Sequence, residues 1–249
     1  TATRAAPQRL TPSAARYAQL AWSPDGQRIV AVRAASRDMQ ETLERFSGGL
    51  GAEFVWVPAA GGAVTVIAPT GGRQNPHFGS DSTRIYSYSS QEGLVSMRWD
   101  GTDVKGHLKV TGAAQPGSTN PPPAAMILMA PRGDQALAQV GSDLYAVTVP
   151  VVGGQTPTVS VADPANAAFP VRKLTEIGGE FPAWDVTGRK AHWSIGNAHV
   201  VYDLDRARAV EDSLRAAPRD TTVKERPGYH PEERRIRITA PRDVPRQSL

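Results

Sequence analysis

The chain has 249 residues, a formal net charge of +4, ordinary apolar content, 23 glycines, 21 prolines and no cysteine. This composition excludes disulfide bonds and thiolate metal sites, and it is typical of neither a disordered nor a fibrous protein. Its apolar runs fall well short of the 18 residues that a membrane-spanning helix needs, so we expect no membrane span.

A turn motif between two short strands is the first recognisable element. In residues 20–30, a Trp-Ser-Pro-Asp-Gly turn separates two apolar stretches. Proline presets φ, aspartate bonds back to the backbone and glycine accepts a positive φ, so this motif predicts a tight turn. The same frame occurs four times, with successive spacings of 56, 51 and 55 residues, anchored at Gly26, Ser82, Gly133 and Gly188.

Further short strands follow each of the first three turns. Phe54–Val57 and Val64–Ile67 flank Gly61-Gly62, which indicates a hairpin. The corresponding pairs in the next two units are 97–99 with 108–111 and 143–147 with 171–175. Four strands in each unit of about 40 to 55 residues predict an all-β fold, a β-propeller of four-stranded antiparallel blades.

Insertions lengthen two of the units. Residues Arg37 to Phe46 are expected to form a short helix, and residues Gly112 to Pro123 form a loop rich in proline, glycine and serine. Such insertions explain why the spacing between turns is irregular.

Both ends of the repeat look incomplete. Leu10-Thr11 resembles the last strand of a blade whose earlier strands are missing, and the pattern stops after the hairpin of the fourth unit. We therefore expect residues 1–205 to be part of a larger ring. The blades Arg16–Thr70 and Phe181–Asp205 should each be flanked by β-structure from outside the chain. The alternative is a closed four-bladed ring in which the strand before Leu10-Thr11 pairs with Val200–Leu204.

The excess positive charge lies in residues 206–249, which hold 11 Lys or Arg against 7 Asp or Glu. Their only aromatic residue is Tyr229, whereas nucleic-acid binders place aromatic residues among their basic ones, so we expect no nucleic-acid partner. This segment is predicted to be a basic connector to a separate domain. Its alternation at Arg234–Ala240 predicts a strand that packs outside the blades and buries Ile236 and Ile238 on one face.

No complete catalytic, cofactor or metal site can be assigned to residues of this chain. His192 and His199 lie across an expected strand-turn-strand and could bind a ligand if they face the same side, although structural roles are favoured. Ser194 lacks the preceding glycine of a Gly-x-Ser-x-Gly nucleophile turn. The glycines at 49 and 51 have no phosphate-loop context, so a loop cluster is favoured.

Two other residue types recur along the chain. Asp25, Asp81 and Asp185 occupy equivalent or neighbouring turn positions, so turn geometry is favoured over a carboxylate site. The five tryptophans fall mainly on expected strands and should fill the space between blades. For Trp193, stacking against a ligand near the channel mouth is the alternative.

Several of these segments resemble known families. The segment Trp22-Ser23-Pro24-Asp25-Gly26 resembles the TolB-like repeat of the periplasmic protein TolB and of many bacterial propellers. Glu180–Trp184 with Trp193–Asn197 resembles the last blade of propellers fused in front of amidohydrolases, and residues 231–245 resemble the connector to that catalytic domain. The resemblance implies a metal-dependent hydrolase of C–N bonds, usually exported, whose metal ligands start with a His-x-His motif in a barrel.

This chain contains no His-x-His motif, so no catalytic residue is carried over. We expect no cofactor in the chain itself and a divalent metal such as zinc in a catalytic domain outside it. The sequence thus predicts a non-catalytic propeller that scaffolds an exported, periplasmic or secreted, amidohydrolase-type enzyme and restricts substrate access. Its expected partners are that catalytic domain or further blades, and self-association stays open.

Two alternatives remain open at the level of sequence. One is a stand-alone TolB-like propeller that recruits a protein, and the other is the gating propeller of a prolyl-oligopeptidase-type serine peptidase. The encoded sequence beyond Leu249 separates them. A His-x-His motif favours the hydrolase, a stop codon the stand-alone module, and a Gly-x-Ser-x-Gly with Asp and His the peptidase.

Overall fold

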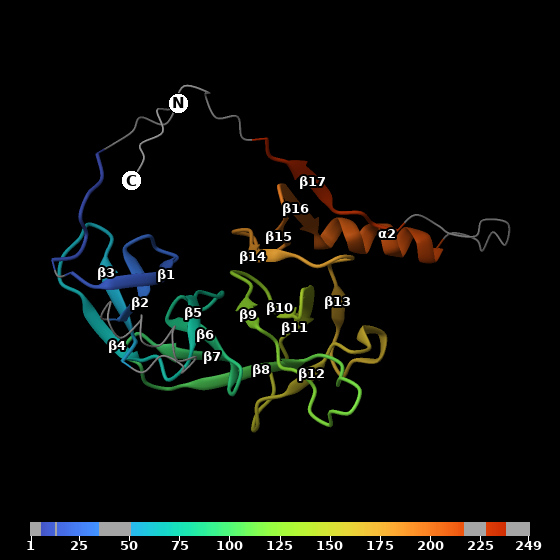
Figure 1. Cartoon of the computed structure of the whole chain (residues 1–249), viewed down its shortest axis with the longest axis horizontal. Coiled ribbons are helices and arrows are strands. Elements are labelled where there is room, and N and C mark those ends of the chain that lie inside the picture. Colours follow the sequence, from blue (N-terminus) through green and yellow to red (C-terminus); the bar gives the residue numbers. More distant parts are fainter. Residues whose placement is uncertain (1–5, 13, 35–50, 217–227, 238–249) are drawn as a thin grey trace, which may run out of the picture.

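The computed structural model describes residues 6–12, 14–34, 51–216 and 228–237. Their strands form four sheets that follow one another as blades I to IV around a common middle, with the first strand of each blade innermost (Figure 1). The prediction of an all-β propeller with four mainly antiparallel blades is confirmed. The short helix expected at Arg37–Phe46 lies outside the described residues.

The blades have the following strands, each antiparallel to its neighbours. Blade I contains β1 (Arg16–Trp22), β2 (Arg28–Ala34), β3 (Glu53–Pro58) and β4 (Thr65–Pro69). Blade II contains β5 (Gln74–His77), β6 (Arg84–Ser89), β7 (Gly93–Arg98) and β8 (Lys105–Thr111). Blade III contains β9 (Met126–Met129), β10 (Gln135–Val140), β11 (Asp143–Thr148) and β13 (Val171–Lys173). Blade IV contains β14 (Glu180–Trp184), β15 (Lys190–Ile195), β16 (Ala198–Asp203) and β17 (Glu232–Arg235).

The four repeated turns each join the first and second strands of a blade, as the sequence predicts. In blade I the Asp25 carboxylate accepts the amide hydrogen of Gln27 at 3.0 Å, and Gly26 takes a φ of +69°. In blade II the Asp81 carboxylate accepts the amide hydrogen of Thr83 at 2.9 Å. These carboxylates therefore cap turns, because the backbone there leaves amide groups without a ladder partner.

Three apolar cores join the four blades in series. The core between blades I and II includes Val30, Phe54 and Ile85. A larger core joins blades II and III, and a third joins blades III and IV. Among the described residues no core joins blade IV to blade I. The blades therefore form an open arc, because stacking of one sheet on the next stops at both ends.

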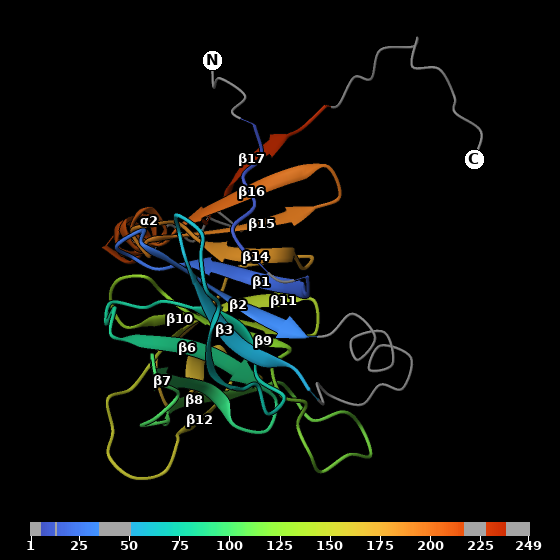
Figure 2. The same ribbon diagram turned by 90° about the vertical axis from the view of Figure 1, so that its left-hand side faces the viewer.

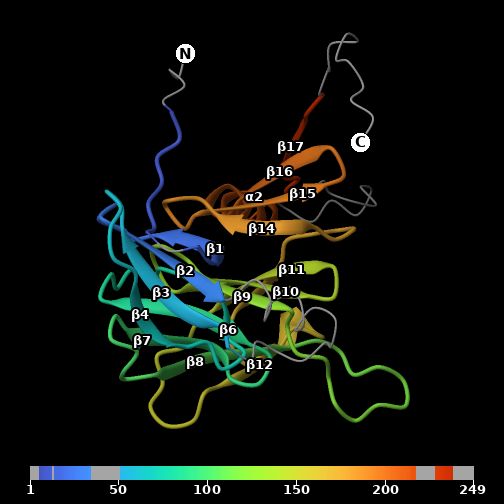
Figure 3. The same ribbon diagram turned by 60° about the vertical axis from the view of Figure 1, so that its left-hand side comes forward.

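A fifth strand crosses from one blade to its neighbour and was not predicted. The chain leaves β11 of blade III and forms β12 (Thr158–Ser160), which pairs parallel to β8 of blade II before returning as β13. Val159 is fully buried in the core between the two blades. A Cβ atom on Gly106 would lie 1.9 Å from the hydroxyl of Thr156, so a larger residue there would displace the Thr156 side chain of the crossing segment. Residues 112–123, which were expected to form a loop, connect β8 to β9 without helix or strand and extend away from the blades (Figure 3).

The C-terminal segment differs from its prediction. A helix, α2 (Leu204–Ala216), follows β16 directly and lies beside the ends of the blade IV strands (Figures 1 and 2). The strand expected at Arg234–Ala240 outside the blades is instead β17, which ends at Arg235 and pairs with β16 as the outer strand of blade IV, so its predicted place was wrong. Ile236 is 58% exposed, so its predicted burial is wrong, because this charged edge strand ends before the isoleucine. Ile238 lies outside the described residues, and the division into 1–205 and 206–249 stays a prediction.

The closed-ring alternative is also not what the structure shows. The edge of β16 pairs with β17, with Val200 opposite Glu233 and Val201 opposite Glu232. Leu10 instead accepts a hydrogen bond from the amide of Gly62, at the hairpin of blade I. Within the described ranges, no helix is long and apolar enough to cross a membrane.

Candidate functional site

One position of the repeat shows how each blade packs against the blade before it. The residue that opens the turn is Trp22, Phe78, Met129 or Trp184 in blades I to IV. Phe78 and Met129 are buried in the core shared with the preceding blade. The indole N–H of Trp184 donates to the carbonyl oxygen of Leu128 in the preceding blade at 3.0 Å. In contrast, 60% of Trp22 is exposed.

The position two residues earlier behaves in the same way. Pro76, Ile127 and Pro182 are buried in blades II, III and IV, whereas Leu20 in blade I is 64% exposed. The exposure is concentrated at the inner strand, since Ile29, which lies opposite Trp22 in the register of β1 and β2, is buried. Blade I therefore presents an apolar surface, formed by Leu20 and Trp22, at positions that a preceding blade covers elsewhere in the arc.

The far end of the arc has a different chemistry. His192 occupies the position of Val30, Tyr86 and Leu137, each of which packs in the core toward the next blade. His192 Nδ1 lies 3.2 Å from His199 Nε2, and the two rings are stacked. They do face the same side of blade IV.

The histidines share this outward face with charged side chains. Lys190 and Asp203 form an ion pair of 3.4 Å on neighbouring strands. Partial burial and the neighbouring His199 lower the pKa of His192, so its imidazole stays neutral near pH 7. Across the described ranges, no group of three or more His, Asp or Glu side chains could hold a metal ion. The outward face of blade IV is therefore polar, unlike the surface at the other end.

The structure also places the other residues that the sequence singled out. Trp193 is only 2% exposed and lies in the core between blades III and IV, so it fills space between blades as expected. Ser194 lies within β15, opposite His199 of β16, in a regular strand. Hydrogen bonds from the hydroxyls of Ser23 and Thr83 lower the pKa values of Asp25 and Asp81, which keeps both turn carboxylates charged.

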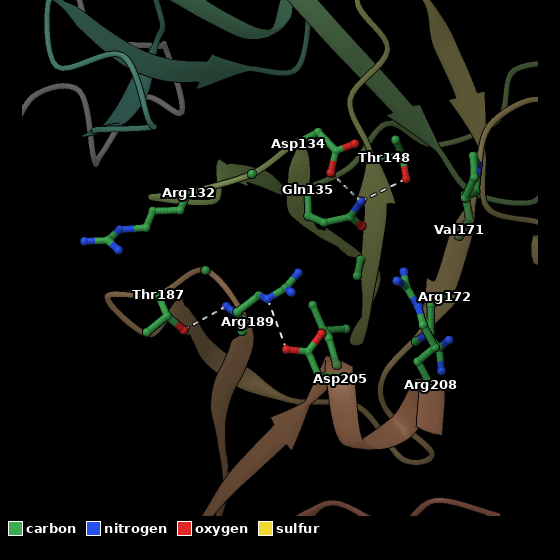
Figure 4. A pocket seen from close by; sticks show the side chains of 15 residues that line it. Arg132, Asp134, Gln135, Thr148, Val171, Arg172, Thr187, Arg189, Asp205 and Arg208 are labelled. Carbon is green, nitrogen blue, oxygen red and sulfur yellow. Dashed lines mark hydrogen bonds and ion pairs between the residues drawn. The ribbon is translucent and has the colours of Figure 1, made fainter. Parts of the chain in front are cut away.

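A cleft of about 850 Å³ lies between the turn ends of blades III and IV, and Figure 4 shows it from close by. Its walls are the β9–β10 and β14–β15 turns, the end of β11, the start of β13 and the first turns of α2. The residues that line it with charged or polar side chains are Arg132, Asp134, Gln135, Thr148, Arg172, Thr187, Arg189, Asp205 and Arg208. Four arginines and two aspartates give this lining a formal charge of +2.

The four arginines differ in how they are held. Arg189 pairs with Asp205 at 3.0 Å, and Arg172 makes a two-pronged ion pair with Glu211 of α2. The side chains of Arg132 and Arg208 have no hydrogen bond or ion pair with any residue that the structure describes. The cleft thus combines two fixed guanidinium groups with two that are free to bind.

Sequence reasoning missed this cleft because its residues come from segments far apart in the chain. One signal was available. Arg132 stands in blade III at the turn position where blades I and II have Asp25 and Asp81, so it departs from the requirement of the turn.

No protein-family model matches the sequence, and no curated protein matches it. Solved structures do share the fold. Oligogalacturonate lyase from Vibrio parahaemolyticus has a TM-score of 0.50 and 9% identity, over 80% of this chain and 55% of the lyase. An oligogalacturonate lyase in complex with manganese has a TM-score of 0.48 and 14% identity, over 80% and 54%. A putative TolB from Agrobacterium tumefaciens has a TM-score of 0.25 and 15% identity, over 62% and 73%.

At these identities the likeness shows the β-propeller fold alone. The chain spans about half the length of the two lyases.

Proposed function

We propose that this chain is a non-catalytic propeller segment of an exported, metal-dependent hydrolase of the amidohydrolase type. In that protein it scaffolds the catalytic barrel and restricts substrate access. The observation that carries the proposal is the exposure of Leu20 and Trp22 at positions that a preceding blade covers in the other blades. An exposed apolar surface at a sheet face favours a contact with further β-structure.

The way the chain uses its polar groups supports a scaffold role. The guanidinium of Arg84 is buried within blade II, where it donates to the hydroxyl of Ser96 at 2.7 Å and to the carboxylate of Asp103 at 2.8 Å. Asp25 and Asp81 cap turns. These groups stabilise the blades, because a buried charge must be paired and turn amides need acceptors.

The chemistry of the two ends of the arc suggests which end contacts a further blade and which end contacts the catalytic domain. Cores between blades are apolar in this chain, so the surface formed by Leu20 and Trp22 suits a further blade. The polar outward face of blade IV suits a domain boundary, because contacts between domains are more polar than permanent cores. The resemblance of residues 180–197 to the last blade before an amidohydrolase barrel agrees with that order. A divalent metal such as zinc would belong to the barrel.

The proposal is tested on the whole gene product that contains residues 1–249. We expect a His-x-His motif in the encoded sequence after Leu249 and hydrolysis of amide or lactam substrates that chelation abolishes. The His192→Gln variant should retain the activity of the wild-type protein. A stop codon directly after Leu249, or hydrolysis abolished by His192→Gln, would overturn the proposal.

Export is tested separately by cell fractionation. The intact protein is expected in the periplasmic or secreted fraction, because the resembling enzymes are usually exported. Recovery in the cytosolic fraction alone would contradict this part of the proposal.

A further inference from the structure

We propose that the arginine-lined cleft between blades III and IV binds a small hydroxylated ligand through its carboxylate or phosphate group. This inference does not depend on the proposed function, because it rests on side chains of this chain alone.

The cleft is a fixed feature of the fold. A Cβ atom on Gly188 would lie 2.6 Å from the carbonyl oxygen of Arg132, so the β14–β15 turn is held tightly against the β9–β10 turn. On the opposite wall, the ion pair between Arg172 and Glu211 fastens α2 to blade III. Blade III, blade IV and α2 therefore keep the lining residues in place without a ligand.

The free arginines give the cleft its preference for anions. Arg208 projects from α2 beside Arg172, whereas Arg132 lies on the other side, on the β9–β10 turn, and extends away from the other labelled side chains (Figure 4). A guanidinium group offers five N–H donors in a planar fork that matches the oxygen atoms of carboxylate and phosphate groups. The pairs of Arg172 with Glu211 and of Arg189 with Asp205 use only some of their donors, so both can add hydrogen bonds to a bound anion.

Arg132 is not explained by the needs of the turn. At this position the carboxylates of Asp25 and Asp81 accept backbone amide hydrogens in blades I and II. The blade III turn keeps a glycine with positive φ, Gly133, but loses the side-chain cap. A residue that gives up a stabilising hydrogen bond and lines a cleft is a candidate for ligand binding.

The neutral lining residues add a preference for hydroxyl groups. The side-chain amide of Gln135 donates to the hydroxyl of Thr148 at 2.9 Å, so that hydroxyl can donate its own hydrogen to a ligand. The carboxylate of Asp134 lies on the same wall and can accept from a ligand hydroxyl. The two aspartates also limit the positive charge of the cleft, which favours a small ligand over a long polyanion.

Calorimetric titration of the full chain tests the inference. Citrate and glycerol 3-phosphate are titrated separately at constant ionic strength, with chloride as the reference anion. We expect saturable binding of at least one probe at one site per chain. Citrate alone would identify a carboxylate site, glycerol 3-phosphate alone a phosphate site, and both a general site for either group.

Variants separate the cleft from general charge attraction. Arg208→Gln should weaken binding about tenfold, because it removes charge-assisted hydrogen bonds, and Arg132→Gln should weaken it about threefold, because its guanidinium extends away from the others. Arg98→Gln, which removes the same charge from blade II, should change the affinity less than about twofold. All three arginines are exposed, so unchanged melting temperatures should confirm folding. Absence of saturable binding by both probes, or equal weakening by Arg98→Gln, would overturn the inference.

Discussion

Blade III and blade I carry the same pattern on their first strands but meet different surroundings. Ile127 in β9 is fully buried in the core between blades II and III, whereas Leu20, at the same repeat position in β1, is 64% exposed. The two side chains are similarly apolar, so the difference lies in the neighbour. The first strand of a blade is completed by the blade before it, and blade I has no such cover in the described part of the chain.

Truncating these two side chains should give the largest contrast. Ile127→Ala should lower the free energy of unfolding by about 2–5 kcal/mol, because it leaves a cavity in a packed core. Leu20→Ala should change it by less than about 0.5 kcal/mol, because its side chain is mostly in solvent. Urea unfolding of residues 1–249 measures both. Similar losses for the two variants would mean that the open surface of blade I is already covered.

A pH change should sharpen the contrast between the core that joins blades II and III and the exposed surface of blade I. His77 of β5 accepts the amide hydrogen of Met129 of β9 through Nε2 at 2.7 Å, and its Nδ1 lies 2.7 Å from the carbonyl oxygen of Asn75. This arrangement requires the neutral ring, and burial lowers the pKa of His77 to about 4. The first blade has no histidine.

Protonation of His77 therefore favours the unfolded state. Its contribution to stability should be complete above pH 6.5 and should fall by about 3 kcal/mol as the pH falls from 6.5 to 4. His107 and His192, whose pKa values burial also lowers, act in the same direction. The effect of His77 is therefore measured as the difference in the free energy of unfolding between the wild-type protein and the His77→Gln variant across this pH range. Identical pH dependence in both proteins would contradict the prediction.

Two glycines at one repeat position give a smaller contrast. Gly26 and Gly188 have φ values of +69° and +67°, so alanine strains the backbone at both, by about 1–2 kcal/mol. At Gly188 the new methyl group would also meet blade III, whereas at Gly26 it would meet nothing within 4 Å. Thermal unfolding should show that Gly188→Ala costs about 1 kcal/mol more than Gly26→Ala. Equal costs would show that the contact with the preceding turn does not constrain Gly188.

The parts of the fold that follow local rules could be predicted from the sequence. The turns at Gly26, Ser82, Gly133 and Gly188 could be predicted, because tight turns require particular residues wherever they occur. The strand β12 was not, because three residues give no periodicity and its partner β8 is almost 50 residues away. The stability of such a strand comes from a tertiary contact.

The elements at the blade IV end of the arc, α2 and β17, show the same limit of prediction from sequence. Asp203 accepts the amide hydrogen of Arg206 and caps α2, which is a local signal that could have been used. The alternation at Arg234–Ala240 predicted a strand there, but the charged residues of β17 carry no apolar alternation, so its bounds and its place beside β16 follow only from the pairing. The cleft was hidden for a related reason. Its arginines reach one place only after blades III and IV have packed together.

The central claim is that further β-structure covers the surface formed by Leu20 and Trp22 in the intact protein. Hydroxyl-radical footprinting of the whole gene product tests this directly, since it reports the oxidation rate of each tryptophan without any substitution. Trp193, which is 2% exposed, provides the buried reference. We predict that Trp22 is oxidised about as slowly as Trp193 in the intact protein. Oxidation of Trp22 at the rate of a freely exposed tryptophan would contradict the account.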